Sequence, residues 1–211
     1  ATMNQIETSP VVSFERFAPP IIRDIEKVGY GWEIEQREEE QEDQRKGLSN
    51  EGDAELIGIA RGLKENITRE GLDEHVNILI EGGRLVIRIE TEGVLFESGS
   101  AQLTNEVKPL LNIIADSLKF YRGLVMVEGH TDNVPIHTAK YPSNWELSTS
   151  RAVSVLKYWI DNQMMLPGDV VAAGYADTKP IGTNDNAQGR AKNRRVEILV
   201  LSRDEARTIT R

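Results

Sequence analysis

The sequence contains no cysteine, which excludes disulfide bonds, thiol catalysis and zinc sites built on cysteine. It also lacks any run of about 18 apolar residues, the length that a helix needs to cross a bilayer, so we predict no membrane span within it. A signal peptide is missing as well, and the first residue is Ala1 rather than methionine. We interpret this start as that of a processed or truncated chain, so the question of a missing N-terminal anchor stays open.

Acidic side chains outnumber basic ones. The 211 residues carry 25 Lys and Arg against 34 Asp and Glu, a net charge of −9. A nucleic-acid-binding protein needs a basic face, so this class is excluded. The serines lack the G-x-S-x-G pattern of serine hydrolases, and the glycines lack a phosphate-binding spacing. The sequence therefore predicts neither an enzyme nor a cofactor site. The length allows one good-sized core with extensions, or at most two small domains.

The amino-acid composition of the chain changes near residue 53. Between Trp32 and Lys46, seven acidic side chains stand against three basic ones, and a polar segment with two glycines follows at 47–53. A solvated linker or exposed helix explains this composition, and a spacer between an upstream anchor and a downstream domain is the sharper alternative. We predict a linker-like or plug-like regulatory extension at 1–53, a folded domain at 54–202 and a frayed tail at 203–211.

Regular hydrophobic periods mark the elements of the folded domain. They predict helices from Ala54 to near Gly71, at 104–120 and at 144–162, and strands at 76–80, 85–89, 124–128, 170–173 and 195–201. Two adjacent glycines between the first two strands predict a two-residue hairpin loop. This order indicates an α/β (α+β) sandwich, a βαβαβ mixed sheet with helices on one face.

Several side chains receive more specific predictions. Ser143 and Glu146 are spaced as a capping box for the helix at 144–162. Trp145 and Trp159 are expected in the core. The first helix carries an apolar stripe that a lone domain need not bury, which favours a dimer. The stripe consists of Leu56, Ile59, Leu63 and Ile67.

Asp132 and Arg151 are the strongest candidates for a binding site. Asp132 follows a predicted strand, and Arg151 lies in the first half of the next helix, eight residues after Ser143. Each has an ordinary explanation, a turn cap for Asp132 and a surface ion pair for Arg151. Together, with Asn144 beside them, they indicate a receptor for a zwitterion, in which Asp132 binds an ammonium and Arg151 a carboxylate. The loop at 134–142 should form the rim of this site.

A metal site is the alternative reading of the same region. His130, Asp132 and His137 are ligand types for zinc, but the sequence offers no further ligand cluster. We instead expect His130 to fix its loop through a hydrogen bond of the ring.

Three motifs carry a resemblance to a known family. They are Gly129-His130-Thr131-Asp132, the stretch Asn144 to Ala152 with Leu147, Ser148 and Arg151, and the stretch Gly189 to Glu197. Residues 84–201 resemble the OmpA-like peptidoglycan-binding domain. The resemblance implies a non-catalytic module that holds the diaminopimelate of the peptidoglycan stem peptide. It assigns the ammonium of that residue to Asp132 and its carboxylate to Arg151. The other implied site residues are Asn144, Leu147 and Arg194, with Phe96 where the family makes backbone contacts to the ligand.

Within the family, the chain is most similar to flagellar motor stator subunits of the MotB/PomB type. The long loop at 134–142, the stretch Ser143 to Ser148 and the stretch Phe96 to Ala101 carry this similarity. It implies the periplasmic part of a single-pass inner-membrane protein, a homodimer, and a channel-forming partner of the MotA/PomA type. The alternatives are an OmpA-like envelope tether of another system, such as an outer-membrane protein or lipoprotein, and a peptidoglycan hydrolase.

Overall fold

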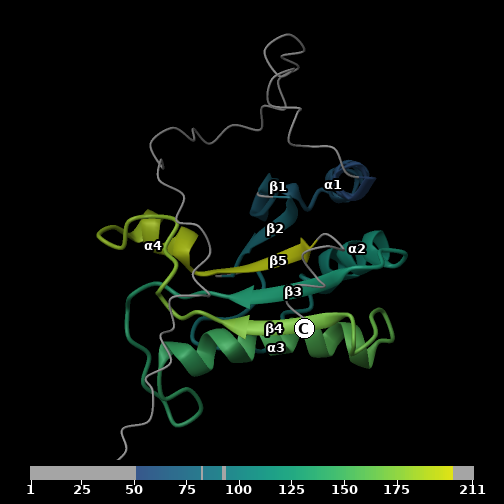
Figure 1. The fold of residues 1–211 in the computed structure, drawn as a ribbon. Helices are drawn as coiled ribbons and strands as arrows, with labels where there is room; N and C mark the ends of the chain where they lie inside the picture. The colour runs from purple at the N-terminus through teal and green to yellow at the C-terminus, as the bar shows by residue number, and fades with distance from the viewer. Residues whose placement is uncertain (1–50, 82, 92–93, 202–211) are drawn as a thin grey trace, which may run out of the picture. The chain divides into compact units, whose positions relative to one another are not determined.

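The folded part of the chain is a five-stranded sheet with helices against one face (Figure 1). The structure is a computed structural model that describes residues 51–81, 83–91 and 94–201. The elements are α1 (Glu51–Arg69), η3 (Asp73–His75), β1 (Val76–Glu81), β2 (Arg84–Glu90), α2 (Lys108–Leu118), β3 (Leu124–Gly129), α3 (Asn144–Asp161), β4 (Val170–Gly174), α4 (Ala187–Asn193) and β5 (Arg195–Leu201).

The sheet is mixed and has the order β1-β2-β5-β3-β4. Only β3 and β4 run parallel, and the other neighbours are antiparallel. Glu81 pairs with Arg84, so β1 and β2 are joined by the predicted two-residue loop. The predicted mixed sheet with helices on one face is confirmed. The last strand, β5, lies in the middle of the sheet, which places the end of the described chain beside β3.

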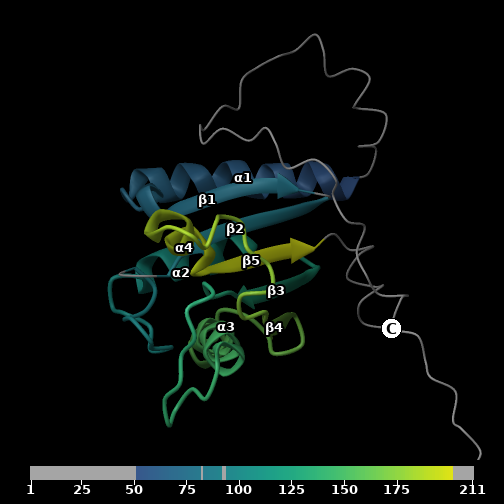
Figure 2. The same cartoon turned by 90° about the vertical axis from the view of Figure 1, so that its left-hand side faces the viewer.

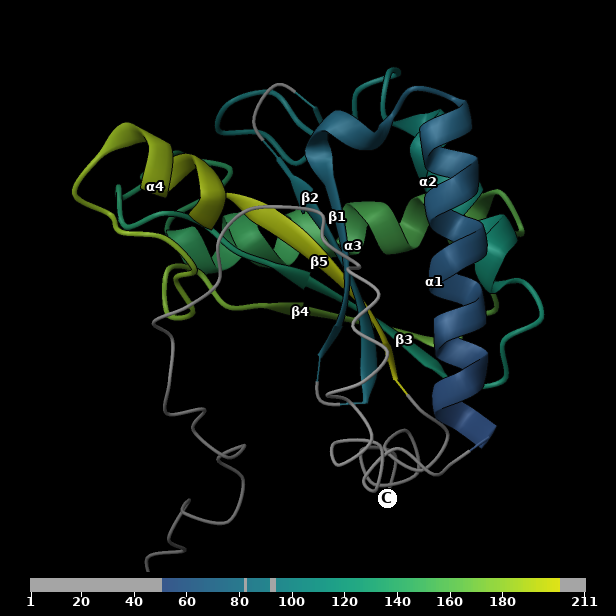
Figure 3. The ribbon, with the colours of Figure 1, turned by 90° about the horizontal axis from the view of Figure 1, so that it is seen from above.

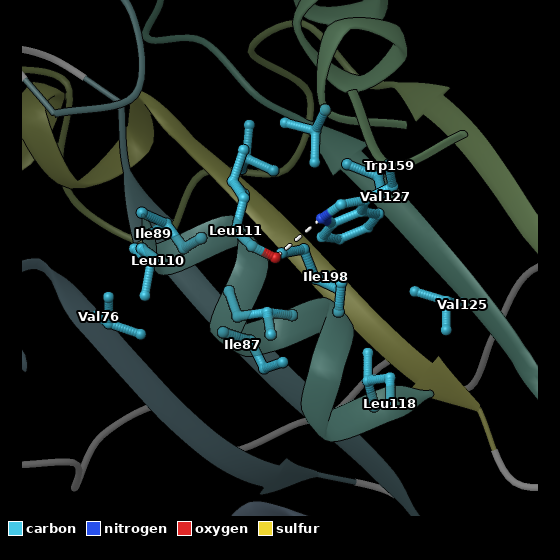
Figure 4. Close-up of a cluster of buried hydrophobic side chains, with 14 of the residues drawn as sticks. Val76, Ile87, Ile89, Leu110, Leu111, Leu118, Val125, Val127, Trp159 and Ile198 are labelled. Carbon is cyan, nitrogen blue, oxygen red and sulfur yellow. Dashed lines mark hydrogen bonds between the residues drawn. The ribbon is translucent and has the colours of Figure 1, made fainter. Parts of the chain in front are cut away.

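The main core lies between the sheet and the helices α1, α2 and α3, which Figure 3 shows on the same side of the sheet. Along β5, Val196, Ile198 and Val200 belong to this core, whereas Leu199 and Leu201 belong to a second cluster. This alternation follows from the period of two along a strand. Trp159 is fully buried, as predicted, and its indole N–H donates a hydrogen bond of 2.9 Å to the carbonyl of Leu111 (Figure 4).

The apolar stripe of α1 is used inside this domain. Leu56, Leu63 and Ile67 are each at most 2% exposed and belong to the main core, and Ile59 packs against it. The stripe lies between α2 and the first two strands, because α1 packs on these elements. The argument for a dimer from an unburied stripe is therefore wrong.

α1 begins at Glu51 rather than at the predicted Ala54, so its first three residues fall within the predicted 1–53 extension. α2 and α4 differ from the prediction for local reasons. α2 begins at Lys108 rather than near Thr104, with Pro109 in its first turn, where the missing N–H of proline costs no hydrogen bond. α4 was not predicted, because Ala187–Asn193 has no apolar period. It starts where the Asn186 side chain accepts a hydrogen bond of 2.7 Å from the backbone N–H of Gly189.

None of the described helices is both long enough and apolar enough to cross a membrane.

Candidate functional site

The predicted site residues gather where β3 and β4 end and α3 begins. Two glycines allow α3 to approach these strand ends closely. A Cβ on Gly129 would lie 2.1 Å from the carbonyl oxygen of Ser148, and one on Gly174 would lie 2.2 Å from the Thr149 hydroxyl oxygen. The first turns of α3 therefore press against the ends of the two strands, and Figure 2 views this end of the domain nearly along the α3 axis. This contact sets the position of Arg151 relative to Asp132.

Asp132 is held by two hydrogen bonds and is 7% exposed. One carboxylate oxygen accepts from the backbone N–H of Val134 at 3.0 Å. The other accepts from the guanidinium of Arg194 at 2.5 Å. The turn-capping role predicted for Asp132 is thus present, and the same carboxylate also forms an ion pair within the domain. The pair with Arg194 joins two motifs that are 62 residues apart in the sequence.

Asn144 connects the Asp132 loop to the start of α3. Its amide nitrogen donates to the carbonyl oxygens of Asp132 at 3.3 Å and of Val134 at 3.1 Å. Its amide oxygen accepts from the backbone N–H of Ile136 at 3.3 Å. The predicted cap is also present, since the Ser143 hydroxyl accepts from the backbone N–H of Trp145 and donates to Glu146. The loop is therefore fixed to the helix that carries Arg151.

Arg151 is only 3% exposed and has a defined orientation. Its Nε donates to the carbonyl oxygen of Ser100 at 2.9 Å. The guanidinium carbon lies 5.3 Å from the centroid of the Phe96 ring, within the range of a cation–π contact. The side chain of Phe96 is fully buried and so holds the guanidinium of Arg151 in place. The backbone N–H of Phe96 donates a hydrogen bond to the carbonyl of Thr91.

Leu147 is 5% exposed and belongs to a small apolar cluster with Ala101 and Tyr141. This cluster is separate from the main core, and Ile136 of the long loop packs against it. Leu147 thus supports the predicted rim. Of the six predicted site residues, Asp132, Asn144 and Arg194 are joined by direct hydrogen bonds, and Arg151 and Phe96 form a cation–π contact.

His130 does not make the predicted ring hydrogen bond. Both ring nitrogens are buried without a hydrogen-bond partner among the described residues, and the nearer carboxylate oxygen of Glu128 lies 3.5 Å from Nε2. The ring instead stacks on Tyr175, with centroids 5.5 Å apart and planes within 11°. Burial lowers the pKa of His130, and the nearby Glu128 only partly opposes this effect. The neutral ring is thus the form that the fold favours.

Glu197 lies beside this histidine, on the face of the sheet away from the main core. The same carboxylate oxygen accepts 2.7 Å hydrogen bonds from Nε of Arg88 and Nε of Arg195. Burial alone would raise the pKa of Glu197, but the charges of Arg195 and Arg88 outweigh it and lower the pKa to about 2. Glu197 is therefore ionised and bound to two arginines.

The only metal-type cluster in the described part of the chain consists of Glu128, His130 and Glu197, whose ligand atoms lie within 4.8 Å of one another. It contains neither Asp132 nor His137, and the latter is hydrogen-bonded to the carbonyl of Pro142 instead. The three cationic side chains around the cluster oppose a bound cation. They are Arg88 and Arg195 on Glu197, and Lys179 at 3.5 Å from Glu128.

Trp145 is not a core residue, contrary to the prediction. Its side chain is 51% exposed, although Ala152, two helical turns later on the same side of α3, is fully buried. The difference arises because β3 and β4 end opposite Ser148 and Thr149, so the first turn of α3 extends beyond the sheet. The helical period of the sequence predicts that Trp145 points toward the sheet. It does not predict that the strands end before they reach Trp145.

Known proteins resemble this chain in sequence. Residues 95–194 match the model of the OmpA family. Motility protein B of Bacillus subtilis is 34% identical over 155 residues, which cover 73% of this chain. The chain spans only part of the relatives that it matches, 59% of the length in this case.

Two solved structures are similar in fold and sequence. The cell wall anchor of the type VI secretion system from Pseudomonas aeruginosa is 41% identical with a TM-score of 0.59, and the match covers 68% of this chain and 96% of that one. A MotB-like protein from Desulfovibrio vulgaris is 28% identical with a TM-score of 0.63, covering 71% and 95%. The motifs that resembled this family are the ones that meet at the strand ends. The chain thus belongs to the OmpA family, and its domain is of the MotB type.

Proposed function

We propose that this domain binds peptidoglycan without cleaving it, by holding the zwitterionic end of diaminopimelate. The observation that carries the proposal is that buried side chains of opposite charge lie at the same end of the sheet, Asp132 after β3 and Arg151 on the helix that packs against the end of β3. Asp132 and Arg151 are both largely buried, and each is oriented by hydrogen bonds to its surroundings. Preoriented charges of opposite sign suit a ligand that presents an ammonium and a carboxylate on one carbon atom.

The ion pair between Asp132 and Arg194 affects how each charge of the ligand would be bound. The ammonium would join a carboxylate that already binds one guanidinium, so it adds a second cation to Asp132. The ligand carboxylate would then meet Arg151 and lie close to the positive charge of Arg194. The three side chains carry a net charge of +1, which favours a ligand group with a free carboxylate over one with an ammonium alone. Asn144 and Leu147 would hold the loop and helix around it.

At the level of the cell, we assign this binding to the anchoring of a flagellar motor stator. The similarity to Motility protein B of Bacillus subtilis supports this role. In such a protein the domain would lie in the periplasm, follow an inner-membrane span, form a homodimer and work with a channel-forming subunit of the MotA/PomA type. Residues 1–53 would act as a regulatory extension that controls how far the domain reaches toward the cell wall.

A second assignment has its own support. The domain is also similar to the cell wall anchor of a type VI secretion system, at higher identity than to the stator-type protein. An OmpA-like tether of another envelope system would use the same pocket. The two assignments differ in the membrane partner and share the ligand.

Cosedimentation tests the shared part of the proposal. The purified chain should pellet with sacculi that contain diaminopimelate, and the free diaminopimelate tripeptide should release it, because both compete for Asp132 and Arg151. Sacculi with lysine at the third position of the stem peptide should retain much less protein, since lysine lacks the second carboxylate. Equal pelleting with both kinds of sacculi, or no release by the tripeptide, would contradict the proposal.

A further inference from the structure

Trp145 is an exposed aromatic side chain beside the proposed pocket. Its side chain is 51% exposed, whereas Trp159 on the same helix is fully buried. It follows Asn144, whose amide is hydrogen-bonded to the backbone of Asp132 and Val134. It therefore starts one Cα step, about 3.8 Å, from a residue that contacts the pocket.

Val134 extends this apolar surface on the loop side. Its side chain is 55% exposed, and its backbone is bonded both to the Asp132 carboxylate and to Asn144. Two exposed apolar side chains thus flank the one amide that joins the loop to α3. Exposure of an indole is unfavourable, because a tryptophan that is buried contributes more apolar area than most other side chains. The first turn of α3 keeps its indole in solvent at the end of the domain where the charged pair lies.

We propose that Trp145 is a second subsite, at which the indole stacks on a sugar ring of the glycan strand that carries the bound stem peptide. The proposal rests on the function proposed above, because the charged pocket must first hold the third residue of that peptide. The ligand class is an N-acetylhexosamine. Its ring presents a flat face of C–H groups that matches an indole, and its acetamide offers an acceptor to the indole N–H. Among the described residues, no side chain or carbonyl accepts a hydrogen bond from that N–H.

The reach of the peptide agrees with this arrangement. Diaminopimelate is the third residue of the stem, and two residues separate it from the lactyl group of the amino sugar. The side chain of diaminopimelate and the lactyl group add to these two residues, and the whole path equals about five extended residues. At 3.3–3.6 Å for each, the sugar can lie up to roughly 17 Å from the charged end. The exposed indole belongs to the residue after Asn144, in the turn of α3 that precedes the contacts of Ser148 and Thr149 with the strand ends, so it lies within this reach of the pocket. A peptide methyl group would cover only a small part of an indole, whereas a hexosamine ring would cover one face.

Calorimetry with two soluble ligands tests the subsite. One ligand is the diaminopimelate tripeptide, and the other is the same tripeptide on its N-acetylglucosamine–N-acetylmuramic acid disaccharide. The wild-type chain should bind the disaccharide form roughly three- to tenfold more tightly, the range expected of one aromatic stacking contact. Trp145→Ala should remove this preference and leave the affinity for the bare tripeptide unchanged. Trp145→Phe should restore part of it.

Phe120→Ala is the matched control, because Phe120 is 84% exposed and follows α2, near the start of β3 and so at the opposite end of the sheet. It should change neither affinity. Equal binding of the two ligands by the wild-type chain would overturn the sugar subsite while leaving the peptide pocket intact. An equal loss for both ligands in Trp145→Ala would also overturn it, because the indole would then act on the peptide. Failure of the wild-type chain to bind either ligand would overturn the proposed function itself.

Discussion

Asp132→Asn and Arg151→Lys are each expected to weaken binding of the diaminopimelate tripeptide by about 10- to 100-fold. A hydrogen bond to a charged group contributes about 1.5–3 kcal/mol, and about 1.4 kcal/mol corresponds to a factor of ten. Asparagine keeps the shape of Asp132 but removes the charge that would bind the ammonium. Lysine keeps the charge of Arg151 but loses the planar guanidinium that donates to Ser100, lies over the Phe96 ring and would meet a carboxylate with two donors. Calorimetry or equilibrium dialysis measures both affinities.

The conservative substitutions separate binding from folding. Alanine at Arg151 would leave a cavity in a site where the side chain is 3% exposed, so a loss of binding there would be ambiguous. Asp161→Asn, at the exposed C-terminal end of α3, removes one carboxylate far from the pocket and should bind as the wild-type chain does. Circular dichroism should show the same helix content in all these variants. Wild-type affinity in both pocket variants would refute the assignment of the ligand charges.

Gly129→Ala is expected to lower both stability and binding. The added methyl group would lie 2.1 Å from the carbonyl oxygen of Ser148, and this neighbour is backbone that no rotamer change can remove. α3 would have to move away from β3, and overpacking of this kind costs about 1–3 kcal/mol. The melting temperature of a domain of this size should fall by roughly 2–4 °C for each kcal/mol lost. Because α3 carries Asn144 and Arg151, the tripeptide affinity should fall as well, even where the variant is fully folded.

Gly168→Ala is the control for this variant, because no atom lies within 4 Å of the position of its Cβ. Its free energies of unfolding and of binding should both match those of the wild-type chain within about 0.5 kcal/mol. Differential scanning calorimetry followed by ligand titration at a temperature below the transition measures both effects. If Gly129→Ala melts and binds like the wild-type chain, close packing of α3 on the strand end does not position the site.

The fold was largely predictable because its elements follow hydrophobic periods. Apolar runs marked all five strands, and the paired glycines before Arg84 fixed the hairpin register that the structure confirms. The helix at Asn144–Asp161 was predicted within a residue at its end, because Ser143 and Glu146 mark its start. α4 could not be predicted in this way. Its seven residues are polar or small and have no apolar stripe. The helix starts at the Asn186 cap.

The site was predictable only as a set of candidates. The sequence places Asp132 and Arg151 on neighbouring elements, but the ion pair between Asp132 and Arg194 depends on β5 lying beside β3. The stacking of His130 on Tyr175 depends on β4 pairing with β3 on its other side. The exposure of Trp145 depends on where two strands end. Each of these features depends on which elements are neighbours in the fold. The hydrophobic period of the sequence carries no information about these neighbours.

The central claim is that the pocket binds an ammonium and a carboxylate together, and a single calorimetric series tests it most directly. The series uses the wild-type chain and three tripeptides that differ only at the third residue, with diaminopimelate, with lysine, and with diaminopimelate amidated at the carboxyl group beside its free ammonium. Loss of one charged contact should weaken binding by about tenfold or more, so the first peptide should bind at least tenfold more tightly than the other two. Equal affinity for all three peptides would contradict the claim, because Asp132 and Arg151 would then not recognise the two charges of one ligand.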